Sequence, residues 1–166
     1  GNSSHVTIKN NYLNVTVDGA SALNGAPLTD IISLTSDSWL ITGNQMYKGI
    51  QLGTGSGNTI TNNTIGMDST LTNCFSGAGG ISLATTDSVV GGTGASDANI
   101  VCSAGDGVYL ADGAAASANS VLGNVLLVDG KAITASQNLL PAPVIRAVNE
   151  SGGNTTVAFE LNLAAG

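Results

Sequence analysis

Two short patterns of hydrophobic and polar residues alternate along most of this chain. In the first pattern, an aliphatic residue is followed by a turn of Asn or Gly and then by a second aliphatic residue. Clear copies occur at 8–13, 41–46, 60–65 and 121–126, with a degenerate copy at 89–93. A phrase that returns in a fixed order is typical of a repeat architecture.

The second pattern is aliphatic, polar, aliphatic, and it often follows a glycine. Its copies begin at Ile32, Ile50, Ile81, Val108 and, more weakly, Ile133. These copies alternate strictly with those of the first pattern. Each repeat is therefore predicted to contain a short strand, a turn, a second short strand and a connection of variable length.

Such short strands cannot bury much surface alone, but stacked repeats form continuous aliphatic columns and pair every backbone group with the next coil. The sequence predicts an all-β, single-stranded parallel β-helix (β-solenoid) of about five coils over residues 1–138. A β-sandwich would need turns at a regular spacing of about 8–12 residues. A doubly wound fold would need helices that this composition does not supply.

The pattern changes after Asn138. Pro141 and Pro143 end the repeat, because proline removes a backbone donor from the ladder. Alternating runs at 144–148 and 156–163 are joined by 149–154, which contains two glycines, and this arrangement predicts a β-hairpin. Residues 139–166 are expected to be a cap or the start of an immunoglobulin-like module.

The composition narrows the choice of partners. Charged residues make up 9% of the chain, and four Lys and Arg against eleven Asp and Glu give a net charge of -7. Four basic residues are too few to neutralise a row of phosphate groups. No nucleic-acid partner is therefore expected. No apolar run reaches about 18 residues, so no membrane insertion is expected. No charged and hydrophobic signal pattern opens the chain, so a secretory signal is absent here or has been removed, and both ends look like cuts in a longer precursor.

The stretches 57–68 and 105–110 resemble repeats of right-handed parallel β-helix proteins, in particular large bacterial secreted and surface proteins of the pectate-lyase-like superfamily. The resemblance covers roughly residues 4–138, and its motifs are specific for a fold rather than for an activity. It implies a right-handed winding and an extracellular or cell-surface location.

The first pattern places one asparagine at the same corner of successive coils. Asparagine tolerates a left-handed backbone, and stacked amides can hydrogen-bond from coil to coil. This structural ladder is predicted to contain Asn11, Asn44, Asn63 and Asn124, with Gly92 in the degenerate coil.

Two cysteines precede consecutive copies of the second pattern at similar distances. Cys74 lies seven residues before Ile81 and Cys102 lies six before Val108. A coil spacing of about 4.8 Å suits a disulfide, which would require an oxidising compartment. Two stacked free thiols and a metal site are the alternatives, although no His or third Cys is near.

Two columns of polar residues and one pair of aromatic residues have a functional interpretation beside a structural one. Lys48, Gly79, Asp106 and Lys131 share a column, where Asp106 and Lys131 could form a surface ion pair or a Lys could act as the base of a lyase. Asn58, Asp87 and Asn119 offer oxygens to calcium, although calcium takes six to eight. Trp39 and Tyr47 could contact a glycan, although Trp39 could instead cover the end of the core.

The lone histidine, His5, has no acidic neighbour in the sequence and is a poor candidate for a catalytic base. No catalytic residue is assigned from the sequence, and no cofactor is assigned either.

These observations favour a non-catalytic extracellular structural module, either part of a surface adhesin or a self-assembling fibre subunit. Its partners would be copies of itself or neighbouring domains of the same precursor. The alternative is a polysaccharide-binding β-helix or a polysaccharide lyase or hydrolase. Ice binding is disfavoured, because the column that should be a threonine ladder reads Lys9, Thr42, Thr61, Val90 and Leu122.

Overall fold

The computed structural model describes residues 3–23, 29–111, 118–135, 144–151 and 154–160. The chain divides into two compact units, Gly1–Ser136 and Gln137–Gly166, close to the predicted boundary after residue 138. In the second unit, β17 (Val144–Ser151) and β18 (Asn154–Glu160) pair antiparallel as a hairpin. The predicted strand break at 139–143 lies outside the described residues.

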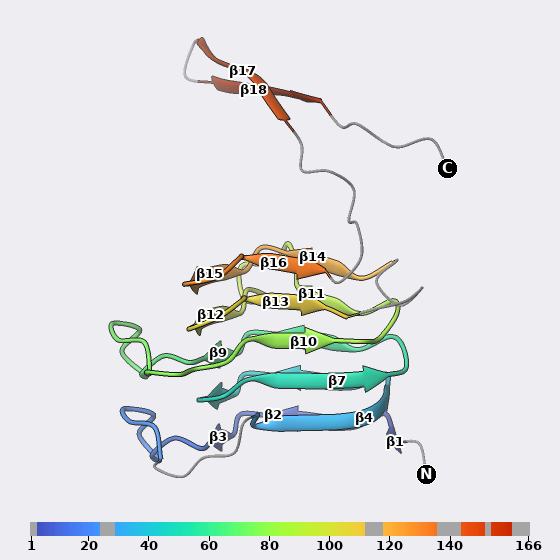
Figure 1. The fold of residues 1–166 in the computed structure, drawn as a ribbon, viewed down its shortest axis with the longest axis vertical. Coiled ribbons are helices and arrows are strands. Elements are labelled where there is room, and N and C mark those ends of the chain that lie inside the picture. The colour runs from blue at the N-terminus through green and yellow to red at the C-terminus, as the bar shows by residue number, and fades with distance from the viewer. Residues whose placement is uncertain (1–2, 24–28, 112–117, 136–143, 152–153, 161–166) are drawn as a thin grey trace. The chain divides into compact units, whose positions relative to one another are not determined.

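The first unit consists of three parallel sheets (Figure 1). The first sheet contains β1 (Ser3–Ser4), β4 (Ile31–Asp37), β7 (Ile50–Thr54), β10 (Ile81–Leu83), β13 (Val108–Leu110) and β16 (Ile133–Ala135). The second contains β2 (Thr7–Lys9), β5 (Leu40–Thr42), β8 (Thr59–Thr61), β11 (Val89–Gly91) and β14 (Ser120–Leu122). The third contains β3 (Tyr12–Leu13), β6 (Gln45–Met46), β9 (Thr64–Ile65), β12 (Ile100–Ser103) and β15 (Val125–Val128).

The chain visits the three sheets in turn and then begins the next coil, so the molecule is a parallel β-helix of about five coils, as the pattern predicts. Aliphatic side chains at equivalent positions of successive coils stack on one another and form a continuous hydrophobic core between the sheets. Fully buried members include Ile41, Met46, Ile50, Leu52, Ile60, Ile65, Ile81, Leu83, Val90, Val101 and Val108. The right-handed winding stays a prediction.

The register of the first sheet differs by one residue from the prediction. Ile31, not Ile32, aligns with Ile50 and points into the core, while Ile32 is 58% exposed. The carboxylate of Asp30 fixes this register, because it accepts the backbone N–H groups of the next coil, including that of Gly49 at 3.2 Å. A slip of one residue would break these bonds and turn every side chain of β4 to the other face.

The degenerate coil is also shifted by one residue. Val90, not Val89, aligns with Ile60 in the core, and Gly91 aligns with Leu122 on the outside. Gly91 has a φ of 81°, and a Cβ there would lie 2.0 Å from the carbonyl oxygen of Leu122. Only glycine fits this position, so it fixes the register.

Four of the five ladder asparagines directly follow a left-handed residue, which corrects the prediction that the ladder residue itself adopts this conformation. Between the second and third sheets the left-handed residue is Asn10, Gly43, Asn62 and Gly123, with φ between 54° and 66°. Between the first and second sheets it is His5, Ser38, Gly57, Asp87 and Ala118. His5 and Asp87 are therefore exposed corner residues.

Candidate functional site

A ladder of asparagines runs through all five coils at the corner between the second and third sheets. In each step, Nδ2 and the backbone N–H of one asparagine donate to Oδ1 of the next, at 2.8–3.1 Å. The same Nδ2 also donates to backbone carbonyls of its own and the preceding coil. The rungs are Asn11, Asn44, Asn63, Asn99 and Asn124.

Asn99 is the rung that the sequence prediction missed, and the placement of Gly92 in this column is wrong. Residues 92–98 form an insertion in which the Asp97 carboxylate accepts the N–H of Gly94 at 2.8 Å. The chain then re-enters the column at Asn99. Its signal in the sequence is the spacing of Asn99 to Val101, which repeats that of Asn63 to Ile65.

A second polar column occupies the corner between the first and second sheets. Asn58 accepts the N–H of Trp39 at 3.1 Å and donates its own N–H to the hydroxyl of Ser88 at 3.2 Å. Ser88 in turn donates its N–H to Oδ1 of Asn119 at 2.8 Å. Ser88, not Asp87, shares the column with Asn58 and Asn119, because the degenerate coil is shifted. The three predicted calcium ligands therefore do not converge, and the oxygens of Asn58 and Asn119 already accept hydrogen bonds.

The two cysteines form a disulfide, with their Cα atoms 5.7 Å apart. It joins the long connection between β9 and β10 to β12 in the third sheet. The free-thiol and metal alternatives for Cys74 and Cys102 therefore do not apply.

The two aromatic residues predicted to contact a glycan serve the structure instead. Trp39 is 8% exposed and belongs to the core, so it cannot stack on an external sugar. The ring of Tyr47 packs edge-on against Phe75 with centroids 5.7 Å apart, and its hydroxyl donates to the carbonyl of Ser76 at 2.6 Å. Tyr47 thus anchors the connection that the disulfide also holds.

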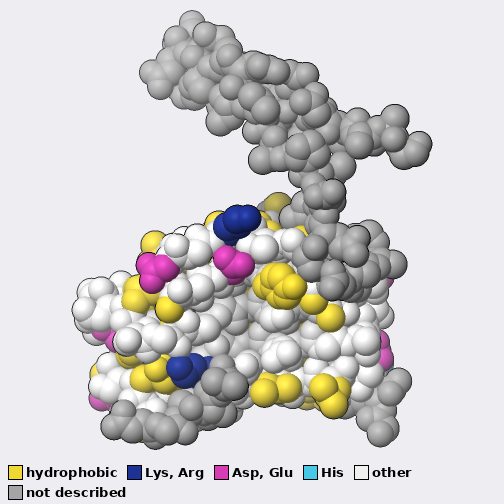
Figure 2. Space-filling view, viewed as in Figure 1, with side chains coloured by type: hydrophobic (Ala, Val, Ile, Leu, Met, Phe, Trp, Pro, Cys, Tyr) yellow, Lys and Arg dark blue, Asp and Glu magenta, His cyan; other side chains and the backbone are white. Residues whose placement is uncertain are grey.

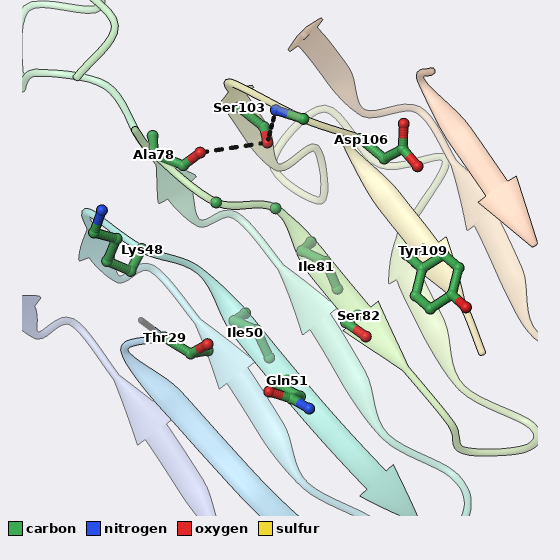
Figure 3. A pocket seen from close by; sticks show the side chains of 13 residues that line it. Thr29, Lys48, Ile50, Gln51, Ala78, Ile81, Ser82, Ser103, Asp106 and Tyr109 are labelled. Carbon is green, nitrogen blue, oxygen red and sulfur yellow. Dashed lines mark hydrogen bonds between the residues drawn. The ribbon is translucent and has the colours of Figure 1, made fainter. Parts of the chain in front are cut away.

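The predicted lysine and aspartate column borders a depression of about 350 Å³ on the outside of the first sheet (Figure 3). Gly79 and Gly80 line part of it, and only glycine fits at Gly79, because a Cβ there would lie 2.1 Å from the carbonyl oxygen of Lys48. Lys48 is at one end, where its ammonium donates to the carbonyl of Gly77 at 2.7 Å and lies 4.1 Å from the Tyr47 ring centroid. Asp106 is at the other end.

Asp106 contacts Lys131 through the backbone rather than through a side-chain ion pair. The N–H of Lys131 donates to Oδ1 of Asp106 at 2.8 Å. This hydrogen bond is the main reason why the pKa of Asp106 lies below its ordinary value, and the charge of Lys131 adds a smaller effect. The carboxylate is therefore ionised at neutral pH and is a weak base.

Three outward side chains from neighbouring strands face the same depression (Figure 3). Gln51 of β7, Ser82 of β10 and Tyr109 of β13 align across the first sheet. Tyr109 is 36% exposed. Together they offer amide, hydroxyl and aromatic groups, which suit a polar and largely neutral ligand such as a sugar.

Comparison with known proteins gave no match: no family model, no curated protein and no solved structure is significantly similar to this chain. The parallel β-helix therefore rests on the strand pairing alone. Within the described ranges, no three His, Cys, Asp or Glu side chains come together as a metal site would require. The same residues include no helix of the length and apolar character needed to cross a membrane.

The connection between β9 and β10 is organised by one carboxylate, that of Asp68. It accepts the N–H of Thr72 at 3.0 Å, Nδ2 of Asn73 at 2.6 Å and the hydroxyl of Thr70 at 2.9 Å. The Thr72 bond contributes most to a pKa well below the ordinary value of 3.8. The Asp68 side chain can accept all of these hydrogen bonds only as an ionised carboxylate, so the stability of the connection depends on pH.

We expect Asp68 to make the connection acid-sensitive. Because its pKa is lower in the folded state, its stabilisation is complete well above the ordinary value of 3.8 and is lost as the pH falls through that value towards the folded pKa. Urea unfolding at pH 6, 4 and 3 should show Asp68→Asn losing less stability on acidification than the unmodified chain. Asp129→Asn, at an exposed position, is the control. Equal acid sensitivity of Asp68→Asn and the unmodified chain would contradict this role.

Proposed function

We propose that this chain is a non-catalytic structural module of an extracellular or cell-surface protein, as part of an adhesin or as a fibre subunit. The two polar columns carry this proposal. The buried side-chain amides of Asn44, Asn63 and Asn99 form hydrogen bonds that join one coil to the next. Interior polar groups thus stiffen the stack of coils, and stiffness is the property that a spacer or a fibre requires.

The external location is supported by the disulfide and by the surface. Disulfides persist mainly in oxidising compartments outside the cytosol. The face in Figure 2 carries few charged side chains, and hydrophobic and uncharged groups cover the rest of what it shows. The resemblance of the repeats to the pectate-lyase-like superfamily, as found in large bacterial surface proteins, agrees with this location.

The test is an assay for turnover on a panel of acidic and neutral polysaccharides, with release of reducing ends and of unsaturated products as readouts. We expect no product above the level of a heat-inactivated sample. Lys48→Ala and Asp106→Asn are the diagnostic variants, because these residues are the charged groups of the depression. Turnover that disappears in either variant would overturn the non-catalytic proposal.

A second candidate function is polysaccharide binding without cleavage, favoured by the row of Gln51, Ser82 and Tyr109 over the depression. Aromatic rings and amides are common contacts for sugars, and the ring of Tyr109 is accessible. Calorimetry with the same panel would detect such binding. Tyr109→Ala should abolish it, whereas Tyr12→Ala, at an exposed tyrosine of the third sheet, should leave it unchanged.

A further inference from the structure

The two cysteines of the disulfide differ in their exposure to solvent. Cys74 is an exposed residue in the connection between β9 and β10, which projects from the side of the coils (Figure 1). Cys102 lies within β12 and is only 6% exposed. A thiolate opens a disulfide by attacking one sulfur and expelling the other, and access decides which sulfur it attacks. Attack on this disulfide is therefore directed to Cys74, and Cys102 is the leaving group.

A cavity of about 350 Å³ lies beside the disulfide and is lined by both cysteines. Phe75, Leu127 and Val128 contribute apolar side chains to its lining. Leu127 aligns with Cys102 on the neighbouring strand and is 47% exposed, so it has apolar surface that a ligand can cover. A volume of this size suits one or two side chains of a ligand whose thiol reaches the disulfide.

We propose that this disulfide is an exchange site through which the chain becomes covalently attached to a free cysteine of another protein. The partner's thiolate attacks Sγ of Cys74 and forms a new disulfide with it. The bond between Cys74 and Cys102 breaks, and Sγ of Cys102 leaves as a thiolate that takes up a proton from water. One thiol and one disulfide are consumed and one of each is produced, so the exchange needs no oxidant or reductant. It is stoichiometric, and it rests on the adhesin form of the proposed function, whose partner it describes.

The lining of the cavity determines which thiols suit the site. Its apolar side chains favour an apolar residue next to the partner's cysteine. Asp129 is the charged residue among the described lining residues, and the net charge of the chain is -7. An acidic partner segment is therefore repelled, whereas a basic residue is favoured. A basic neighbour also lowers the pKa of the attacking thiol and so increases its thiolate fraction at neutral pH.

Contacts that do not involve sulfur hold the attacked cysteine beside the cavity. The N–H of Phe75, the next residue, donates to the carbonyl of Gly66 at 2.7 Å, and its ring packs edge-on against Tyr47. These contacts limit the movement of Cys74 after the bond opens, even though the rest of the connection loosens. An apolar side chain of the partner in the cavity also occupies space beside Cys102, which slows the reverse attack.

The experiment follows adduct formation between the oxidised full chain and three thiols. The probes are an end-blocked peptide Leu-Phe-Cys-Arg, an end-blocked peptide Ser-Gly-Cys-Glu, and glutathione, which is a small acidic thiol. Samples are quenched with acid and mapped by mass spectrometry without reduction, and each rate is divided by the rate of the same thiol with a small linear disulfide. We expect the adduct on Cys74 with a free thiol at Cys102, and a normalised rate roughly tenfold higher for the apolar basic peptide than for the other two probes.

Two variants test the role of the cavity. Leu127→Ser should lower the normalised rate of the apolar peptide by roughly fivefold, whereas Leu122→Ser, at a similarly exposed leucine of the second sheet, should leave it unchanged. Asp129→Asn should reduce the preference for the basic peptide over the acidic one. Melting temperatures of the variants verify that each is folded.

Several results would overturn the exchange site. They are an adduct mainly on Cys102, no adduct with any probe, or equal effects of the two leucine variants. A normalised rate for glutathione that equals or exceeds that of the apolar peptide would assign the site to small thiols and overturn a protein partner. None of these results affects the turnover assay, which tests the non-catalytic role separately.

Discussion

Replacing Asn63 by alanine is expected to cost about 3 to 5 kcal/mol of unfolding free energy, or to prevent folding altogether. Asn63 accepts two hydrogen bonds from Asn44 and donates to Asn99 and to the carbonyls of Ile41 and Thr61, all in the middle of the ladder. Alanine would leave the backbone N–H of Asn44 buried without an acceptor and would remove the three hydrogen bonds that Nδ2 of Asn63 donates. An orphaned buried group costs about 1–3 kcal/mol, and each lost hydrogen bond adds about 1 kcal/mol.

Urea unfolding followed by circular dichroism would measure this loss. The matched control is Asn11→Ala, which makes the same substitution at the first rung of the same ladder. Asn11 is exposed and accepts no bond from a described residue, so its loss should cost no more than about 1 kcal/mol. Similar losses for both variants would show that the position in the ladder does not determine the cost.

Breaking the disulfide is expected to cost about 3 to 4 kcal/mol. Cys74 and Cys102 are separated by 28 residues, and closing a loop of this length restricts the unfolded chain by about that amount. Cys74→Ser combined with Cys102→Ser should lower the unfolding free energy accordingly. The connection between β9 and β10 should also become a site of limited proteolysis, because the disulfide holds it to β12.

Reductant provides the control for this prediction. It should lower the stability of the unmodified chain to that of the double serine variant and leave the variant itself unchanged. A loss on reduction that also occurs in the serine variant would assign the effect to the reductant rather than to the disulfide.

The repeat patterns predict the fold because they follow from backbone geometry. Each coil lies on another coil, so equivalent positions in successive coils need similar residues. The sequence therefore repeats the inward aliphatic residues, the turn asparagine and the spacing of the cysteines. The parallel β-helix, its number of coils and four of the five ladder rungs could therefore be read from the chain. The disulfide followed from the same reasoning, because stacking brings equivalent positions together.

The errors occurred where a single contact outweighs the pattern. Asp30 holds β4 one residue away from the position that its aliphatic residues suggest, since two backbone N–H groups of the next coil depend on the carboxylate. Gly91 shifts the degenerate coil because no side chain fits beside Leu122. Because of this shift, the sequence analysis placed Asp87 instead of Ser88 in the column of Asn58 and Asn119, and it counted Asp87 as a candidate calcium ligand. The depression was not predictable either, since the approach of Gly79 to Lys48 depends on the three-dimensional path of the backbone.

The connections between the third and first sheets differ widely in length, from residues 47–49 to residues 14–30 and 66–80, while the coils on either side keep their register. The hydrogen bonds that define a coil lie in its strands and corner ladders, so a longer connection adds no strain to them. Foreign peptides could therefore be grafted into this side of the β-helix at intervals of one coil, each at a defined level of the stack. Such a molecule would be a scaffold for displaying peptides at fixed distances. The distance between two grafts would be a multiple of the stacking distance of the strands, about 4.8 Å per coil.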